Sequence, residues 1–112
     1  GFGRAARAGS CALVCVVHNN KLYCGNAGDS MGIIVADEKP ISYKEVNRFL
    51  NADNPEEQQR MKREYPEESD IFICKRPENK SCYVKGRLQP TRSIGDLRLK
   101  LKEFNNPKNY SR

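Results

Sequence analysis

The 112-residue sequence predicts an α+β fold, built mostly from antiparallel strands with one short surface helix. Three observations predict it. Short runs rich in β-branched and aromatic residues recur along the chain, turn residues separate neighbouring runs, and one segment carries the start and stop signals of a helix. The first runs are apolar almost throughout, which is typical of strands covered on both faces. A second layer of structure is therefore expected over them.

The first two runs predict a β-hairpin. Cys11–Val17 is followed by His-Asn-Asn and then by Lys21–Gly25, and asparagine adopts the positive φ that a tight turn requires. Met31–Asp37 continues as a third strand. Ile41–Leu50 keeps no single hydrophobic period, and we favour a strand there.

A short, polar helix is predicted after Asn54. This residue can cap the helix, Pro55 suits the first helical position, and Pro66 ends it. Acidic residues lie near the start and basic residues near the end, as the helix dipole favours. Only Met61 and Tyr65 offer an apolar contact. We therefore expect the helix on the surface of a larger body or in a mobile flap.

The remainder of the chain predicts a second hairpin and a loop. Two short strands, Asp70–Lys75 and Ser81–Lys85, flank the turn-rich segment Arg76–Lys80. The segment Gly86–Asp96 contains a proline and a glycine and predicts a loop. Leu97–Phe104 fits either a helical turn or an alternating edge strand.

The cysteines predict a reduced, intracellular protein. They form an odd set without Cys-x-x-Cys spacing, which favours neither a closed disulfide framework nor a zinc knuckle. If Cys11 and Cys15 share a strand, their Cα atoms lie about 13 Å apart, too far to bridge. The five positions are Cys11, Cys15, Cys24, Cys74 and Cys82. We expect buried thiols in the cytoplasm or the mitochondrion, which the sequence does not separate.

The net charge of +6 comes entirely from one segment. Residues 85–112 hold 8 Lys/Arg against two acidic residues, whereas residues 1–84 hold 12 of each sign. A basic segment can meet nucleic acid, an acidic surface or a phosphorylated substrate, or it can be a solvated surface. Its only aromatic residues are Phe104 and Tyr110, and it has no RRM, KH or zinc signature, so no nucleic-acid partner is expected. The longest apolar run, Cys11–Val17, is too short to span a bilayer, so no membrane partner is expected.

Two Gly-Asp steps are the candidates for chemistry: Gly28-Asp29-Ser30 and Gly95-Asp96. A carboxylate at the end of a strand, beside small residues that let a cation approach, suits a hard ion such as Mg²⁺ or Mn²⁺. An aspartate in such a turn also serves as a local cap for the backbone. Spacing alone leaves both interpretations open.

Four stretches follow one another in a distinctive order: GSCALVCVV, KLYCGNAGDSMGIIV, FLNADN and GRLQPTRSIGD. This order resembles the PP2C-type (PPM family) metal-dependent Ser/Thr protein phosphatases, whose pattern runs Gly-Ser-Thr-Ala, ANxGDSR, LTxDH and (S/T)RxxGD. The resemblance covers about residues 9 to 100. KGRLQPTRSIGDLRLK looks especially similar to the subgroup that includes pyruvate dehydrogenase phosphatase.

The resemblance implies that residues 1–112 are part of an α-β-β-α sandwich. In that family two Mg²⁺ or Mn²⁺ ions bridge a water that attacks phosphoserine or phosphothreonine on a phosphoprotein. Asp29 is implied to lie near the metal cluster, where it can contribute to a third, weaker metal site. Arg92 and Asp96 are implied to brace the core and the flap, with Gly28, Ser30 and Gly95 in support. Residues 53–85 occupy the position of the family's flap, which borders the substrate groove.

The departures from the family pattern are equally specific. Cys11 stands where the family usually has Thr, Met31 where it has Arg, and Asn54 where it has His. The family's DGHGG, DGxxD and DNxT stretches, which carry most of its metal ligands, do not occur in these 112 residues. We therefore expect an internal fragment of a phosphatase that holds no catalytic residue, is inactive alone and self-associates. The alternative is a catalytically dead PP2C-like module that binds or regulates.

Overall fold

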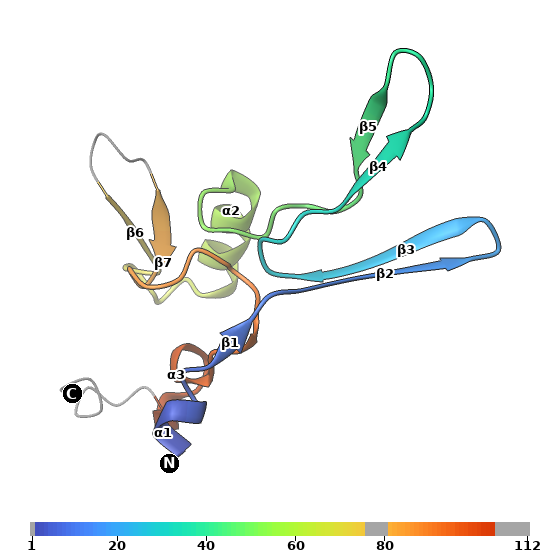
Figure 1. Ribbon diagram of the computed structural model, residues 1–112. Helices are drawn as coiled ribbons and strands as arrows, with labels where there is room; N and C mark the ends of the chain where they lie inside the picture. The colour runs from blue at the N-terminus through green and yellow to red at the C-terminus, as the bar shows by residue number, and fades with distance from the viewer. Residues whose placement is uncertain (1, 76–80, 105–112) are drawn as a thin grey trace.

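The computed structural model describes residues 2–75 and 81–104 of the chain. In chain order the elements are α1 (Phe2–Ala5), β1 (Gly9–Ser10), β2 (Ala12–His18), β3 (Lys21–Ala27), β4 (Ile33–Ala36), β5 (Ser42–Glu45), α2 (Pro55–Glu64), β6 (Phe72–Cys74), β7 (Cys82–Val84), β8 (Ile94–Gly95), α3 (Leu97–Lys100) and the 3-10 helix η1 (Lys102–Phe104). The strands form the antiparallel pairs β1–β8, β2–β3, β4–β5 and β6–β7. Figure 1 shows α2 at the centre, with β2–β3 and β4–β5 projecting from one side of it. This mixture of helices and antiparallel strands confirms the predicted α+β class.

The β2–β3 hairpin forms around the predicted asparagine turn. Asn19 and Asn20 both have positive φ, 48° and 57°. Two such residues match the right-handed twist of the strands that they join. The turn places His18 opposite Lys21, and this pairing fixes the register of the whole ladder.

The later segments agree with the sequence in type but are shorter. The strand expected over Ile41–Leu50 is confined to Ser42–Glu45. After it, the Asn47 side chain accepts a hydrogen bond from the Gly32 N–H and donates one to the Ser30 carbonyl. Leu97–Phe104 adopts the helical alternative, as α3 and η1. The turn expected at 76–80 lies outside the described residues.

Helix α2 begins as predicted. The Asn54 side-chain oxygen accepts a hydrogen bond from the Glu56 backbone N–H at 2.9 Å, and Pro55 occupies the first turn. The buried face differs from the prediction. Met61 is buried, but Tyr65 is 52% exposed, and Glu57 takes the buried place one turn before Met61. Because Tyr65 is the C-cap residue, its backbone has already left the helical path.

The hydrophobic core is small and lies around α2. The buried residues of the described chain are Ala6, Gly28, Asn51, Ala52, Glu57, Met61, Ile71 and Cys82. All but Ala6 and Gly28 fall within the segment expected to be a flap or directly before it. The assignment of residues 53–85 as a flap stays a prediction, since the burial reports packing and not motion.

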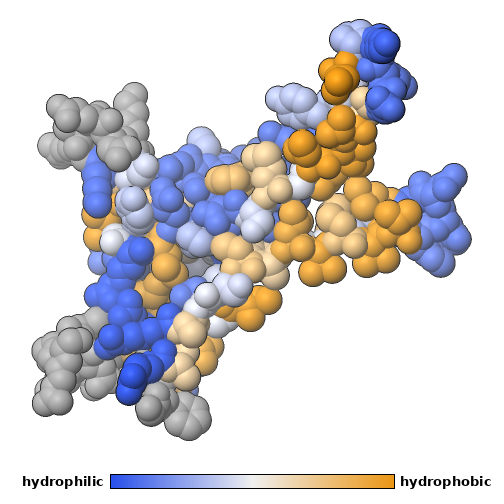
Figure 2. Space-filling model, in the orientation of Figure 1, coloured by the Kyte–Doolittle hydropathy of each residue, from blue (hydrophilic) through white to orange (hydrophobic). Residues whose placement is uncertain are grey.

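The hairpins β2–β3 and β4–β5 expose their apolar side chains, and the described residues do not supply the second layer expected over these strands. Val14, Val17 and Ile33 are each more than half exposed. Figure 2 shows hydrophobic surface along both projecting hairpins. The radius of gyration is 17.4 Å, against about 13 Å for a compact domain of 100 residues. The hairpins extend away from the core, which leaves them uncovered.

The cysteines also correct the prediction. Cys74 and Cys82 form a disulfide, whereas reduced thiols were expected. The register of β6–β7 places these two residues directly opposite each other. The spacing argument could not see this pair, because it considered only cysteines on one strand. Cys15 is free but exposed, so the expected burial also fails there.

No helix in the described part of the chain has the length and apolar character needed to span a membrane.

Glu57 joins α2 to the segment that precedes β8. Its carboxylate accepts two hydrogen bonds from the Arg60 guanidinium, at 3.0 and 2.8 Å, and one from the Thr91 hydroxyl at 2.6 Å. The hydrogen bonds from Arg60 hold the pKa of Glu57 below its ordinary value. Burial opposes this shift, whereas Thr91 and the charge of Arg92 reinforce it. The Glu57 side chain is thus ionised and satisfied within the core.

Replacing Glu57 by glutamine is expected to reduce the free energy of unfolding by about 1–3 kcal/mol at neutral pH. Because the folded pKa of Glu57 lies below its ordinary value near 4.3, its contribution is present above that pH and lost as pH falls through the folded pKa. Stability of Glu57→Gln should therefore decline less steeply in acid. Urea unfolding followed by circular dichroism across pH measures both effects.

The matched control is Glu56→Gln. Glu56 pairs with Arg48, but both side chains are well exposed, and such a pair contributes little. Equal losses of stability in the two variants would contradict the role given to Glu57.

Candidate functional site

The β1–β8 pair brings the two ends of the described chain together. Gly9 pairs with Gly95, and Ser10 pairs with Ile94. The Asp96 backbone N–H also donates to the Ala8 carbonyl at 2.7 Å. Figure 1 shows α1, β1 and α3 gathered at one end of the molecule. The second Gly-Asp step therefore lies against the start of the GSCALVCVV stretch.

Asp96 is positioned by two glycines. Its backbone is left-handed, with φ of 51°, and its carboxylate lies directly over Gly9, where any Cβ would overlap it. Gly95 has φ of 79°, and a Cβ there would overlap the Ala8 carbonyl oxygen. At Gly95 a left-handed backbone and a close approach to the Ala8 backbone together require glycine, whereas at Gly9 the overlap is with the Asp96 side chain.

Asp29 is held by a thiol. The Cys11 Sγ donates to Asp29 Oδ1 at 3.2 Å, across the gap between the end of β3 and the start of β2. Gly28 precedes Asp29 with φ of 126°, and a Cβ on Gly28 would lie 2.6 Å from the Cβ of Cys11. The sequence singled out Gly28 and Asp29 but missed Cys11 as their partner. Its place in a family motif, where Thr is usual, was the available signal.

Both aspartates act on the same thiol. Hydrogen bonding to the Asp29 backbone lowers the pKa of Cys11. Burial, the hydrogen bond to the Asp29 side chain, and the negative charges of Asp29 and Asp96 together raise this pKa above its ordinary value. We call Gly9, Cys11, Gly28, Asp29 and Asp96 the Cys11 cluster. The structure thus places the two Gly-Asp steps around one protonated sulfur.

Side-chain amides hold the loop that follows Asp29. Asn47 accepts from the Gly32 backbone N–H and donates to the Ser30 carbonyl, both at 2.8 Å. Asn26 donates to the Gly28 carbonyl at 3.1 Å. Ser30 therefore supports the loop through its carbonyl. The sequence reasoning did not single out either asparagine.

Arg92 acts on a different part of the chain from the Cys11 cluster. It is exposed and follows Thr91, and its charge acts on Glu57 near α2. The structure therefore brings Gly28, Asp29 and Asp96 to the Cys11 cluster and places Arg92 beside the core. The roles predicted for these residues stay predictions.

The Cys11 cluster does not by itself form a complete site for Mg²⁺ or Mn²⁺. Among the described residues, no three or more His, Cys, Asp or Glu side chains are grouped so that they could hold a metal ion. Hard ions take about six oxygen ligands, whereas this cluster offers two carboxylates and a soft thiol. Asp29 has suitable chemistry for one ligand, but further oxygen ligands are required.

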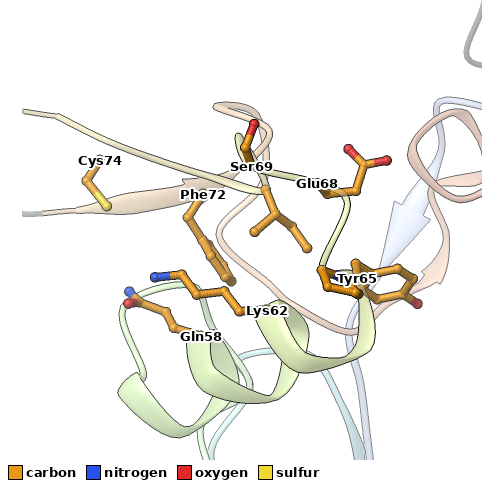
Figure 3. Close-up of a pocket in the computed structure, with 9 residues that line it drawn as sticks. Gln58, Lys62, Tyr65, Glu68, Ser69, Phe72 and Cys74 are labelled. Atoms are coloured by element: carbon orange, nitrogen blue, oxygen red, sulfur yellow. The ribbon is translucent and has the colours of Figure 1, made fainter.

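A pocket of about 400 Å³ lies between α2 and β6. Figure 3 shows Gln58 and Lys62 on α2 facing the Phe72 side chain. The lining residues are Gln58, Lys62, Tyr65, Pro66, Glu68, Ser69, Ile71, Phe72 and Cys74. None of them belongs to the Cys11 cluster, and we assign this pocket no role.

Comparison with known proteins gives one consistent family. The model of the family described as "Protein phosphatase 2C" matches residues 4–111. "Probable protein phosphatase 2C 43" of Oryza sativa subsp. japonica is 35% identical over 101 residues, which cover 88% of this chain and 25% of that protein. "Probable protein phosphatase 2C 79" of Arabidopsis thaliana is 34% identical over 110 residues, which cover 96% of this chain and 28% of that protein. "Probable protein phosphatase 2C 64" of Arabidopsis thaliana is 34% identical over 111 residues, covering 96% and 27%.

The chain thus spans about a quarter of the length of these relatives. No solved structure matches it.

Replacing Gly28 by alanine is expected to destabilise the chain by about 1–3 kcal/mol. The substitution combines a φ that alanine rarely adopts with a collision against Cys11. Gly25→Ala in β3 is the matched control, because no atom lies within 4 Å of the added Cβ. Urea unfolding of the two variants measures the difference. A loss in Gly25→Ala as large as that in Gly28→Ala would contradict the close packing described here.

Proposed function

Because the chain belongs to the protein phosphatase 2C family, we propose that it is part of a protein serine/threonine phosphatase dependent on Mg²⁺ or Mn²⁺. The observation that carries the proposal is the family match over residues 4–111. The pairing of β1 with β8 supports it, since it brings the second Gly-Asp step to the thiol that already binds Asp29. The proposed reaction is hydrolysis of phosphoserine and phosphothreonine in a phosphoprotein.

We propose that Asp29 contributes one carboxylate to a divalent ion in the whole protein, with the other ligands supplied from outside these 112 residues. Bound metal ions supply a water activated for attack on phosphorus. Within this chain, the Cys11 thiol orients the Asp29 carboxylate by its hydrogen bond. Gly28 permits this close approach, and Asn47 fixes the following loop through Ser30. These are positioning roles, and no catalytic residue is assigned within the chain.

Asp96, Gly95 and Arg92 are proposed as structural supports. Asp96 and Gly95 close the β1–β8 pair at the Cys11 cluster. Arg92 adds positive charge near Glu57, beside the helix of the proposed flap. We propose that these residues brace the site instead of touching the substrate.

The proposal stays at the level of the family. The names of the three relatives give no support to the pyruvate dehydrogenase phosphatase-like subgroup. We propose an intracellular location, in the cytoplasm or the mitochondrion. The free thiols Cys11, Cys15 and Cys24 support this location, whereas the Cys74–Cys82 disulfide is of a kind that is rare there.

Self-association of the isolated chain is also proposed. The β2–β3 and β4–β5 hairpins expose apolar side chains along their lengths, including Val16, Val17, Ile33 and Val35. Exposed apolar surface of this kind favours contact with another protein surface.

A second candidate is a catalytically dead PP2C-like module that binds or regulates. The hydrogen bonding of Asn54, which stands where the family usually has His, favours this candidate. Its side-chain oxygen accepts from the Glu56 N–H, and its amide donates to the Phe49 carbonyl at 2.8 Å. Both polar groups of the Asn54 side chain thus form hydrogen bonds to the backbone. Metal-dependent turnover by the whole protein separates the two candidates.

In the whole protein, Asp29→Asn is expected to lower metal-dependent dephosphorylation at limiting Mn²⁺. The substitution removes charge without changing volume. We expect metal affinity to fall by at least about 10-fold, which is the lower end of the loss found when only a partner of a metal ligand is changed. Activity is measured on a phosphothreonine peptide across Mn²⁺ concentrations, with the exposed Asp37→Asn as control. Wild-type activity of Asp29→Asn at every Mn²⁺ concentration would refute the assignment.

The 112-residue chain alone is expected to show no metal-dependent turnover. A two-metal centre needs several carboxylates around ions about 3.5–4 Å apart, and the described residues do not supply them. We would measure hydrolysis of p-nitrophenyl phosphate and of a phosphothreonine peptide with added Mn²⁺ or Mg²⁺. Calorimetric titration measures metal binding alongside. Turnover comparable to that of the whole protein, or tight binding of two ions, would show that the active site has been misplaced.

A further inference from the structure

The β2–β3 hairpin carries two free cysteines directly opposite each other. Cys15 on β2 pairs in register with Cys24 on β3. Their sulfur atoms lie 3.0 Å apart and share a hydrogen bond. The pair belongs to the projecting hairpin and shares no residue with the Cys11 cluster.

The position of this pair within the ladder suits a covalent bridge. His18 and Lys21 flank a two-residue turn, so they form a hydrogen-bonded pair, and the two kinds of pair alternate along the hairpin. Cys15 and Cys24 lie three pairs further along and therefore form a non-hydrogen-bonded pair. In such pairs the Cα atoms are about 4.5 Å apart, which is within the range that disulfides span.

The two thiols differ in access. Cys15 is exposed, whereas Cys24 is half-buried. The hydrogen bond with Cys15, burial and the neighbouring Cys15 charge raise the pKa of Cys24, so Cys24 retains its proton at neutral pH. A reagent from solution therefore meets Cys15 first.

We propose that Cys15 and Cys24 are a redox modification site, which a small-molecule disulfide such as oxidised glutathione converts into a cross-strand disulfide. The β6–β7 hairpin supports this, because its own directly opposed cysteines, Cys74 and Cys82, are already joined. Cys11 is separate, since its thiol is bonded to Asp29.

The oxidation balances as two exchange steps. The Cys15 thiolate attacks one sulfur of oxidised glutathione, whose S–S bond breaks, and the first glutathione leaves as a thiolate. Cys24 then loses its proton to solvent and attacks the Cys15 sulfur, and the second glutathione leaves. The two cysteine thiols lose two protons and two electrons, and the glutathione disulfide is reduced to two thiols. Reduced glutathione reverses both steps.

In the test, the 112-residue chain is equilibrated in glutathione buffers of increasing oxidised fraction. The exchange is then stopped with acid, and the free thiols are alkylated. Trypsin cleaves after Lys21, which lies between the two cysteines, so a bridge keeps the two flanking peptides together. Mass spectrometry is expected to show this linked peptide growing with the oxidised fraction and disappearing after reduction. The Cys11→Ser chain leaves Cys15 as the only cysteine in the first peptide.

Cys15→Ser and Cys24→Ser should each abolish the linked peptide completely. Circular dichroism of each variant reports whether the chain has kept its fold. If Cys11→Ser does not fold, fragmentation of the linked peptide from the unsubstituted chain places the bond on Cys11 or Cys15. Alkylation of both Cys15 and Cys24 in oxidised buffer, or a bond from Cys24 to any cysteine other than Cys15, overturns the proposal.

Discussion

The arrangement of the described chain depends on the buried carboxylate of Glu57. A buried charge without partners is costly, so α2 is stable in its place only where Arg60 and Thr91 meet this carboxylate. Thr91 also donates its backbone N–H to the Leu50 carbonyl, which fixes the same segment a second time. Because this segment leads directly into β8, and β8 pairs with β1, the hydrogen bond from Thr91 to Glu57 links α2 to the end of the chain that carries Asp96.

The hairpins show a different balance of forces. The β2–β3 hairpin is well defined by its ladder and turn, yet it buries little apolar surface, so local hydrogen bonding and turn geometry determine its form. The region around α2 has shorter strands, and hydrogen bonds between residues far apart in the sequence hold it together. Asp53, for example, accepts a hydrogen bond at 2.5 Å from the backbone N–H of Cys82, in β7. Stability and exposed apolar surface are thus located in different parts of the chain.

The sequence predicted the features that depend on neighbouring residues. The turn at Asn19 and the cap at Asn54 were predicted correctly, because each follows from the chemistry of two or three adjacent residues. The bonds from Cys11 to Asp29 and from Cys74 to Cys82 were not predicted, since each depends on the register of strands. Periodicity also missed Glu57, because a charged residue enters the core only when distant partners satisfy it. The family resemblance identified the Gly-Asp steps without revealing the thiol between them.

The β1–β8 pair closes nearly the whole described chain into one loop with only two residue pairs. Such a closure fixes many residues for few hydrogen bonds, and the entropy it requires must be offset by contacts that are already in place. Hairpins form between near neighbours in sequence, whereas this clasp joins opposite ends, so contact-order arguments place its closure late in folding. Asp96 therefore reaches the Cys11 thiol only after the rest of the chain has organised, whereas Asp29 meets this thiol when its own hairpin forms. Opening the β1–β8 pair would move Asp96 away while leaving Asp29 on its hairpin.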